Sequence, residues 1–478
     1  RPRPRFALYG LSGLGSPSSG LTTSRMGGDF SVPVTATASV YGTLHPDFSN
    51  VEIDQQTISP TAYQRSYTEV RPFFTQGANY YDNFNCDACP QISQLYTPAI
   101  PTPRDGYAFE GKQGPFSFAG FDAVGDSRND GATSLGWTSA DNQWRLTAQS
   151  VAANLPGVTD HVDTTGVAWG DNKHISAYFD YGSDSGTNVL AGDRAQRYDG
   201  GLYYFTNTFG FAASERKVGE YYEPVDGFVQ HADIAGYALY ENKIWLFDQN
   251  AWINSIQFGG FLDRYHDRTG VLDQSDTNGW LDILTKSRID VQGTVGSSYL
   301  RLNSGVFTPI SQNGIGIVWH SGTANNPGSN MSHGSSSTPT SISYNTGSFG
   351  PGRVDSWFRS TTMRLGMRGT LTAEADDTRA YEDFGTTNVQ WLERLSYAYA
   401  AGRNSSFAVG VRRIIGTPPV VDVTALPGYV SAWNLTFAYH RRTPHDELYV
   451  AYGDASQLST LPQFVIKLIH YFGAEKGT

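Results

Sequence analysis

The sequence predicts an all-β fold: a large single-chain transmembrane antiparallel β-barrel of roughly 18–20 strands with an internal plug segment. Three observations predict it: two-faced strands, alternating short and long connections, and a composition rich in aromatic residues and glycine but poor in charged residues. The chain has 478 residues, of which 13% are aromatic and 17% charged, and it contains 52 glycines. Its mean hydropathy is nevertheless negative, as expected where apolar and polar residues alternate.

No stretch approaches the ~20 consecutive apolar residues that a transmembrane helix needs. In a bilayer, the remaining way to pair every backbone N–H and C=O group is a closed barrel. A soluble propeller or glycan-binding sandwich would share this composition, so the order of the residues has to decide. A propeller would show a repeat of about 40–50 residues, and the sequence has none.

The closing segment Phe464–Phe472 is the most informative single strand. Large apolar or aromatic side chains occupy most positions of one face, and the segment ends on an aromatic residue. This arrangement resembles the C-terminal signal of Gram-negative outer-membrane barrels. Taken alone, it fits the last strand of a soluble sandwich equally well.

The same two-faced pattern recurs along the chain, and this recurrence favours the barrel. Segments 175–181, 363–371, 407–412 and 432–439 alternate large apolar residues with small, polar or charged ones. Such alternation suits lipid outside and water inside. We expect these side chains of the last segment to face lipid: Trp433, Leu435, Phe437 and Tyr439.

Segment 363–371 carries two arginines, Arg364 and Arg368, on the face opposite its methionines and leucines. A soluble sandwich rarely places two arginines beside glycine and threonine on one strand face. Both arginines are therefore predicted to line the lumen.

Short and long connections alternate, as periplasmic turns and extracellular loops do in outer-membrane barrels. Tight polar turns are predicted at 112–115, 140–142, 170–173, 241–243 and 402–404. Longer connections are predicted at 154–162, 184–197, 215–232, 263–276, 375–388 and 415–429. Within 375–388, the acidic pairs Asp376-Asp377 and Glu382-Asp383 are interpreted as solvated.

The predicted organisation is a flexible N-terminal linker at 1–29 and a transmembrane barrel at 30–478, with a plug-like insertion at 44–104. The linker is rich in glycine and serine, and 321–352 has the same composition without one charged residue, so it is interpreted as a flexible loop. A strand at about 31–43 is expected to lead into the insertion. The part at 44–82 is too charged for a strand in lipid, so it is predicted to enter the barrel from outside.

The formal net charge is −11, which argues against nucleic acid as a partner. The predicted location is the outer membrane of a Gram-negative bacterium, and the expected partners are its lipids and other envelope proteins. Because the chain begins at Arg1, we expect it to be a processed or truncated form.

The two cysteines, Cys86 and Cys89, leave three states open. A single pair cannot form a four-thiolate zinc site, and no histidine follows Cys89 for haem attachment. In an oxidising compartment a small disulfide loop is favoured. Free thiols and metal binding are the alternatives.

One stretch resembles a known family. Leu44-His45-Pro46-Asp47-Phe48-Ser49-Asn50-Val51-Glu52-Ile53-Asp54 is followed by Glu69-Val70-Arg71-Pro72-Phe73-Phe74 and Gln76-Gly77-Ala78. This resembles the signature of a bacterial outer-membrane barrel family of unknown function, except that His45 and Val70 replace Asn and Lys. The resemblance implies a barrel and an outer-membrane location, but no activity. In many members the barrel follows a family-9-type carbohydrate-binding module.

The acidic residues of this signature have two interpretations. As a structural network, Asp47, Glu52, Asp54 and Glu69 pair with Arg71 and backbone donors to fix an extended segment. As a site, the first three could ligate Ca²⁺ through oxygen atoms, although no EF-hand spacing is present. Phe73 and Phe74, like Phe48 part of the signature, are expected to pack as anchors.

No catalytic motif or cofactor-binding motif is recognisable, so we predict neither an enzyme nor a cofactor. Three functions remain open. The first is a porin-like channel for small solutes, since a barrel this wide leaves an aqueous interior unless plugged. The second is a structural or anchoring subunit of an envelope complex. The third is the barrel anchor of a carbohydrate-binding surface protein.

Overall fold

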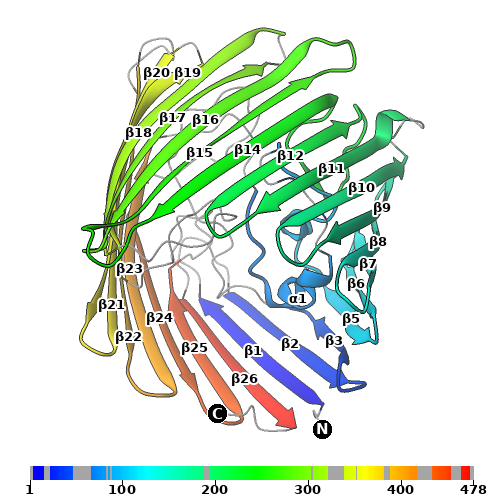
Figure 1. Ribbon diagram of the computed structural model, residues 1–478. Coiled ribbons are helices and arrows are strands. Elements are labelled where there is room, and N and C mark those ends of the chain that lie inside the picture. Colours follow the sequence, from blue (N-terminus) through cyan, green and yellow to red (C-terminus); the bar gives the residue numbers. More distant parts are fainter. Residues whose placement is uncertain are drawn as a thin grey trace.

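The protein is a closed antiparallel barrel of 24 strands (Figure 1). The structure is a computed structural model and describes residues 4–14, 22–46, 66–81, 84, 86, 89–187, 189, 193–302, 305–320, 338–350, 352–381, 388–416, 433–453 and 464–473. Each barrel strand pairs with the next one along the chain, and the last pairs with the first to close the ring. Closure leaves no strand edge with unpaired backbone groups facing lipid.

The wall runs in chain order. Its first half consists of β1 (Arg5–Leu14), β2 (Thr22–Pro33), β3 (Ala38–Leu44), β5 (Asp105–Gln113), β6 (Phe116–Val124), β7 (Asn129–Thr138), β8 (Trp144–Leu155), β9 (Val158–Gly170), β10 (Ile175–Gly186), β11 (Gln196–Phe205), β12 (Phe209–Val218) and β14 (Ile234–Leu246). Its second half consists of β15 (Ile253–His266), β16 (Leu272–Thr285), β17 (Ile289–Arg301), β18 (Phe307–Trp319), β19 (Thr340–Phe349), β20 (Gly352–Leu365), β21 (Gly369–Tyr381), β22 (Asn388–Ala400), β23 (Ser405–Ile415), β24 (Asn434–Arg442), β25 (Asp446–Tyr452) and β26 (Phe464–Gly473). The other described elements are α1 (Pro72–Thr75), β4 (Ile92–Ser93), β13 (Phe228–Val229) and the 3-10 helices η1 (Ala78–Tyr80), η2 (Thr97–Ala99) and η3 (Asp193–Ala195).

The wall has an apolar outer face and a largely polar inner face, as the alternation predicts. On β10, Phe179 is 49% exposed on the outside, whereas the next residue, Asp180, is 0% exposed on the inside. The register of β23 with β24 pairs Val411 with Leu435 on the outer face and Gly410 with Thr436 on the inner face. The all-β barrel predicted from the sequence is thus confirmed.

The barrel has more strands than the sequence count suggests, because several strands have loop-like compositions. β1 and most of β2 lie in the predicted linker at 1–29, and β19 lies in the glycine- and serine-rich stretch at 321–352. The predicted strand at 31–43 is the end of β2, a turn and most of β3. Small polar residues are well suited to an inner face, so their abundance does not indicate a loop here.

Some predicted connections are also wrong. The sequence predicts a turn at 241–243, but these residues lie inside β14. The long connections predicted at 154–162 and 263–276 are much shorter, because strands extend into both stretches. The polar residues in each stretch suggest a loop, but in the structure they alternate with other residues along the strands.

β1 begins and β26 ends at the same end of the barrel, here called the terminal end (Figure 1). Short turns such as 114–115 and 171–174 join strands there, together with the one long connection between β18 and β19. The opposite end, here called the loop end, carries the long connections between β3 and β5 and between β12 and β14.

Arg364 and Arg368 do not share a strand. Arg364 is next to last in β20 and alternates with the exposed residues Met363 and Leu365, so it lies on the inner face. Arg368 lies in the turn between β20 and β21, where Gly366 has a φ of 71°. The prediction that Arg368 lines the lumen is wrong, because the segment interpreted as one strand contains a hairpin turn.

Spin labels placed singly at Asn434 and Leu435 should report opposite environments. The label at 435 should be accessible to oxygen dissolved in lipid, and the label at 434 should be accessible to a water-soluble relaxation agent, since adjacent strand residues face opposite sides. Equal lipid accessibility at the two positions would contradict this assignment of faces.

Candidate functional site

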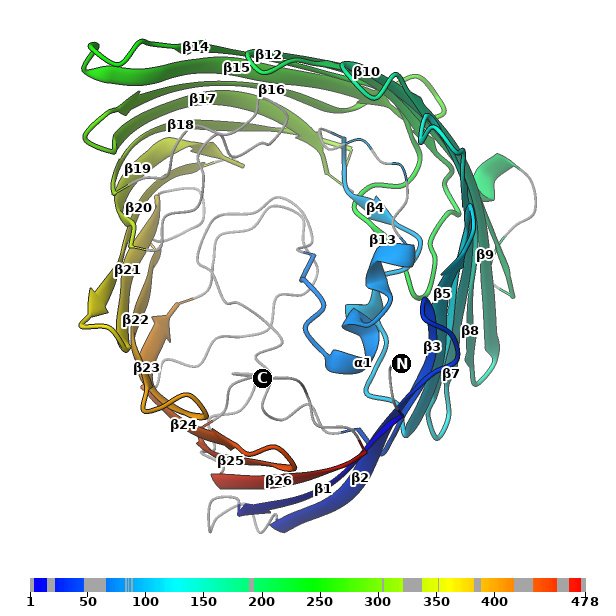
Figure 2. The same cartoon turned by 60° about the horizontal axis from the view of Figure 1, so that its bottom comes forward.

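The described part of the chain between β3 and β5 lies inside the barrel against its inner wall (Figure 2). Its described residues, 66–81, 84, 86 and 89–104, are here called the lumenal insertion and include α1, η1, β4 and η2. Two clusters of buried apolar residues join it to the wall. Among the described residues, no helix is long and apolar enough to span a bilayer.

Arg71 ties together the two arms of the lumenal insertion, a first arm at residues 66–81 and a second arm at residues 89–104. Its side chain is buried, and its Nε and Nη2 donate to the two carboxylate oxygens of Glu69 at 2.9 and 2.7 Å. Its Nη1 donates to the carbonyl oxygen of Ile100, in the second arm, at 2.7 Å. The guanidinium also lies 4.3 Å from the ring centroid of Phe74. These are the strongest kinds of polar contact, a bidentate ion pair and a cation–π contact in a dry site.

The Glu69 carboxylate stays ionised within this site. Burial by itself would raise the pKa of Glu69, but the hydrogen bonds and positive charge of Arg71 outweigh burial and hold the pKa below its ordinary value. The carboxylate also accepts the backbone N–H of Arg71 at 2.8 Å. Each partner therefore depends on the other to remain buried.

The wall is shaped to receive the aromatic residues of α1. Phe73 and Phe74 are buried and pack edge-to-face with Phe121 of β6, at centroid distances of 6.2 and 5.7 Å. Gly106 of β5 lies beneath Phe73, where an added Cβ would sit 2.6 Å from the ring atom Cζ. Only glycine leaves room for the ring at this position, because any side chain would displace it.

A row of buried ion pairs supports the second arm from the wall. Asp180 on β10 pairs with Arg197 on β11, and Asp199 on β11 pairs with Arg216 on β12. All four residues are at most 1% exposed. The Nη1 of Arg216 also donates to the carbonyl oxygen of Pro90 in the lumenal insertion. This row, here called the ion-pair ladder, thus links the wall to the insertion.

Cys86 and Cys89 form a disulfide immediately before Pro90. Both residues are buried in an apolar cluster that includes Val162 of the wall and Tyr222. Of the three states that the sequence leaves open for this pair, the structure has the disulfide.

A second segment, residues 219–233 between β12 and β14, is here called the inward loop because it meets the lumenal insertion. Its strand β13 pairs with β4, and the Gln230 N–H donates to the carbonyl oxygen of Gln91 at 2.9 Å. The Tyr96 N–H donates to the carbonyl oxygen of Asp226 at 2.6 Å. The insertion is therefore held from two sides, by the wall and by the inward loop.

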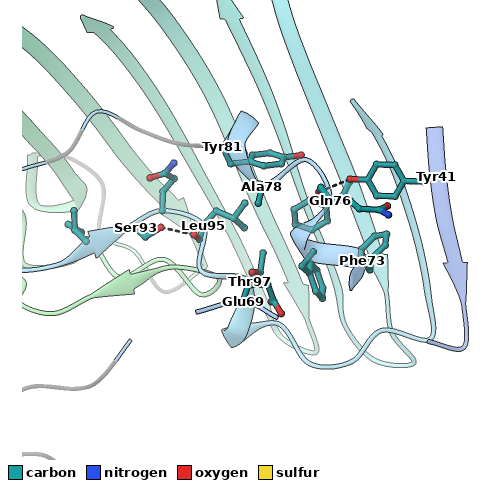
Figure 3. Close-up of a pocket in the computed structure, with 13 residues that line it drawn as sticks. Tyr41, Glu69, Phe73, Gln76, Ala78, Tyr81, Ser93, Leu95 and Thr97 are labelled. Atoms are coloured by element: carbon teal, nitrogen blue, oxygen red, sulfur yellow. Dashed lines mark hydrogen bonds between the residues drawn. The ribbon is translucent and has the colours of Figure 1, made fainter. Parts of the chain in front are cut away.

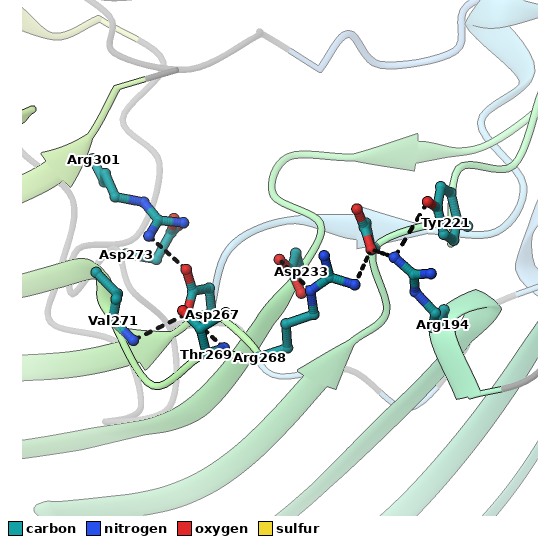
Figure 4. Close-up of polar contacts among 10 residues, drawn as sticks. Arg194, Tyr221, Asp233, Asp267, Arg268, Thr269, Val271, Asp273 and Arg301 are labelled. Atoms are coloured by element: carbon teal, nitrogen blue, oxygen red, sulfur yellow. Dashed lines mark hydrogen bonds and ion pairs between the residues drawn. The ribbon is translucent and has the colours of Figure 1, made fainter. Parts of the chain in front are cut away.

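Ion pairs at the loop end connect the inward loop to η3 and to the β15–β16 hairpin (Figure 4). Glu220 accepts Nη1 of Arg268 at 2.5 Å and also pairs with Arg194. His231 Nδ1 lies 2.7 Å from a carboxylate oxygen of Asp273 on β16. These groups are partly exposed, so each pair contributes little alone, but together they restrict the loop.

A pocket of about 300 Å³ lies between the arms of the lumenal insertion and the wall (Figure 3). Its lining residues are Tyr41, Glu69, Phe73, Phe74, Gln76, Ala78, Tyr81, Ile92, Ser93, Gln94, Leu95, Thr97 and Phe121. Its main polar groups bond within the protein: Tyr41 Oη donates to the Gln76 carbonyl oxygen at 2.7 Å, and Glu69 pairs with Arg71. Because these polar groups already have partners within the protein, we interpret the pocket as space left between packed segments.

The predicted signature residues fall into two groups. The structure brings together Glu69, Arg71, Phe73 and Phe74. Outside the described residues lie Asp47, Phe48, Glu52 and Asp54, so the calcium site and the wider carboxylate network remain predictions. Within the described ranges, no three His, Cys, Asp or Glu side chains are grouped to hold a metal ion.

The prediction that Asp376 and Asp377 lie in a solvated loop is wrong. Both lie in β21 and are buried. Asp376 Oδ1 accepts the backbone N–H of Arg359 at 2.8 Å. This bond links β21 to β20, so the acidic pair is accommodated within the sheet. The alternation that begins at Leu371 continues through Asp376 and Asp377. This continuation is the sequence signal that could have assigned both residues to a strand. The pair Glu382-Asp383 lies outside the described residues.

The sequence matches no known family model and no curated protein. Its fold is similar to that of the siderophore receptor PirA from Pseudomonas aeruginosa, which aligns over 99% of this chain and 81% of its own, with a TM-score of 0.51 and 8% identity. The chain is a bacterial outer-membrane β-barrel. The loop end is therefore extracellular, and the terminal end is periplasmic.

Two other solved structures are similar over nearly the whole chain. The ferric enterobactin receptor PfeA from Pseudomonas aeruginosa aligns over 99% of this chain and 82% of its own, with a TM-score of 0.47 and 8% identity. The translocation pore of the P pilus usher PapC aligns over 98% and 99%, with a TM-score of 0.34 and 11% identity.

Replacing Arg71 with methionine should release the lumenal insertion while the barrel stays folded. The change leaves the buried Glu69 carboxylate without its cation, and breaking a buried ion pair costs about 3–5 kcal/mol. Limited proteolysis should then cut within 66–81. The matched control is Arg104→Met, because Arg104 pairs with Asp105 on the surface. If 66–81 resisted protease equally in both variants, Arg71 would not be the anchor.

Proposed function

We propose that this protein is an outer-membrane channel for small polar solutes, narrowed by the lumenal insertion. The observation that carries the proposal is the position of the insertion, which packs on one part of the inner wall through buried contacts. A passive barrel of this width would leave a large aqueous interior. An insertion fixed by ion pairs reduces that interior without filling it from all sides.

The inner face of β17 and β18 supports this proposal. Thr294 and Gln312 belong to that face, and both are exposed to solvent. Along the same face lie Gly296 and Gly314, so this part of the wall is polar, uncharged and of low relief. Such a surface suits the passage of neutral hydrophilic solutes better than strong selection by charge. Arg364, nearer the terminal end, would add a positive charge to the periplasmic side of the path.

We also infer that the chain belongs to the barrel family of unknown function whose signature residues 44–78 resemble. Neither an enzymatic activity nor a cofactor is part of the proposal. An anchoring role in an envelope complex is the alternative. It predicts that the purified barrel conducts no ions.

Single-channel recording in planar bilayers tests the proposal. The wild-type protein should conduct, and deletion of residues 46–80 should raise the unitary conductance because it removes the arm anchored by Arg71 and Phe73. Gly106→Leu should do the same with the full chain present, since the new side chain occupies the place of the Phe73 ring. The matched control is Gly10→Leu, because an added Cβ at Gly10 meets nothing within 4 Å.

Folding of each variant is checked by the shift in electrophoretic mobility that folded barrels show on heating. Conductance of folded Gly106→Leu equal to that of the wild type would contradict a channel narrowed by the insertion. A wild-type protein and deletion variant that are both folded and silent would contradict the channel itself and favour the anchoring role.

A further inference from the structure

We propose that the outer face of β20 and β21 binds the phosphate groups of lipid A in the outer leaflet. The binding surface, here called the arginine patch, consists of Arg353, Asp355, Arg359, Asp377 and Arg379. On β20 the patch residues alternate with the buried inner-face residues Val354 and Ser356. On β21, Asp377 and Arg379 pair in register with Trp357 and Asp355, which places them on the same outer face.

The exposed parts of the patch are guanidinium groups, and the carboxylates lie beneath them. Asp377 is paired by Arg359 and, at 3.2 Å, by Arg379 Nε. The Asp377 side chain is 3% exposed, whereas those of the two arginines are 40% and 47% exposed. Arg353 covers Asp355 in the same way, with an Nη2–Oδ1 distance of 3.1 Å. What a neighbouring molecule meets here is therefore positive.

The formal charge of the patch is also positive, because its three arginines outnumber its two aspartates. The whole chain, in contrast, carries a net charge of −11. Two guanidinium groups that share one buried carboxylate retain N–H donors that no carboxylate of the patch can accept. A planar fork of N–H donors matches the oxygens of a phosphate better than a single ammonium group does.

The height of the patch on the barrel selects a lipid headgroup. At ~3.3 Å per residue and a tilt of ~40°, Arg359 lies roughly 15 Å above Leu365 along the membrane normal, and Arg353 roughly 30 Å above it. The apolar band of such barrels is about 25 Å tall. Asp355 and Arg379, which pair in register, lie roughly 25 Å above Leu365 and therefore at the extracellular edge of that band, where lipid phosphates lie. The Arg359 side chain extends up toward this edge, where it pairs with Asp377. The half-exposed ring of Trp357 lies between the charges, as aromatic residues do at membrane interfaces.

Lipid binding can be measured by native mass spectrometry on the full-length protein released from nanodiscs of phosphatidylcholine that contain a small fraction of diphosphoryl lipid A. The wild type should retain lipid A, and retention should fall as salt is added, because the attraction is electrostatic. Arg359→Gln combined with Arg379→Gln should weaken retention at least about tenfold, the loss expected for one or two charge-assisted hydrogen bonds. Lipid A without phosphates should be retained as poorly by the wild type as diphosphoryl lipid A is by the double variant.

Two further variants separate binding from folding. Arg104→Gln is the matched control, since Arg104 is 47% exposed and pairs with Asp105 away from the patch; its lipid retention should equal that of the wild type. Asp377→Asn removes the buried charge but keeps both arginines, so retention should stay equal or increase, whereas a purely structural ion pair would lose it. Equal retention of lipid A by the folded double variant, or of phosphate-free lipid A by the wild type, would overturn the proposal. The proposal would also be overturned if a co-purifying protein were found bound to β20 and β21 while lipid A was not retained.

Discussion

The need to pair every backbone N–H and C=O group within lipid determines the rest of this structure. It requires that β26 returns to β1, and it places the polar residues of each strand on the inner face. With 24 strands, the ring is too wide for its own side chains to fill. The interior must then hold water, additional chain, or both. The lumenal insertion supplies chain, and its position follows from the direction of β3, which ends at the loop end.

The wall beneath the insertion differs chemically from a wall that faces water. It combines a glycine that admits a ring, Gly106, with the buried ion-pair ladder of Asp180, Arg197, Asp199 and Arg216. Buried charges are costly unless each has a partner, so the ladder favours one docked position over many loose ones. The disulfide and the inward loop restrict the same arm of the insertion.

The fold class could be predicted from the sequence because alternation in strands such as 432–439 depends only on local order. The strand number could not, because β2 and β19 are at least half glycine, serine and threonine, which suit both loops and an inner face in contact with water. Glu69 and Arg71 are close in sequence, so their pairing could be anticipated. The ion-pair ladder could not, because it depends on the register of three strands. Arg368 was misplaced because one pattern of alternation continued across a turn.

The docking of the lumenal insertion is the central claim, and hydrogen exchange of the wild-type protein in nanodiscs tests it most directly. Amides in 66–81 and 89–104 that are hydrogen-bonded in the docked segment should exchange slowly, on the time scale of the barrel strands, because they are released only when the insertion leaves the wall. Exchange within seconds across both stretches, while the strands stay protected, would show that the insertion is not docked and would contradict the account.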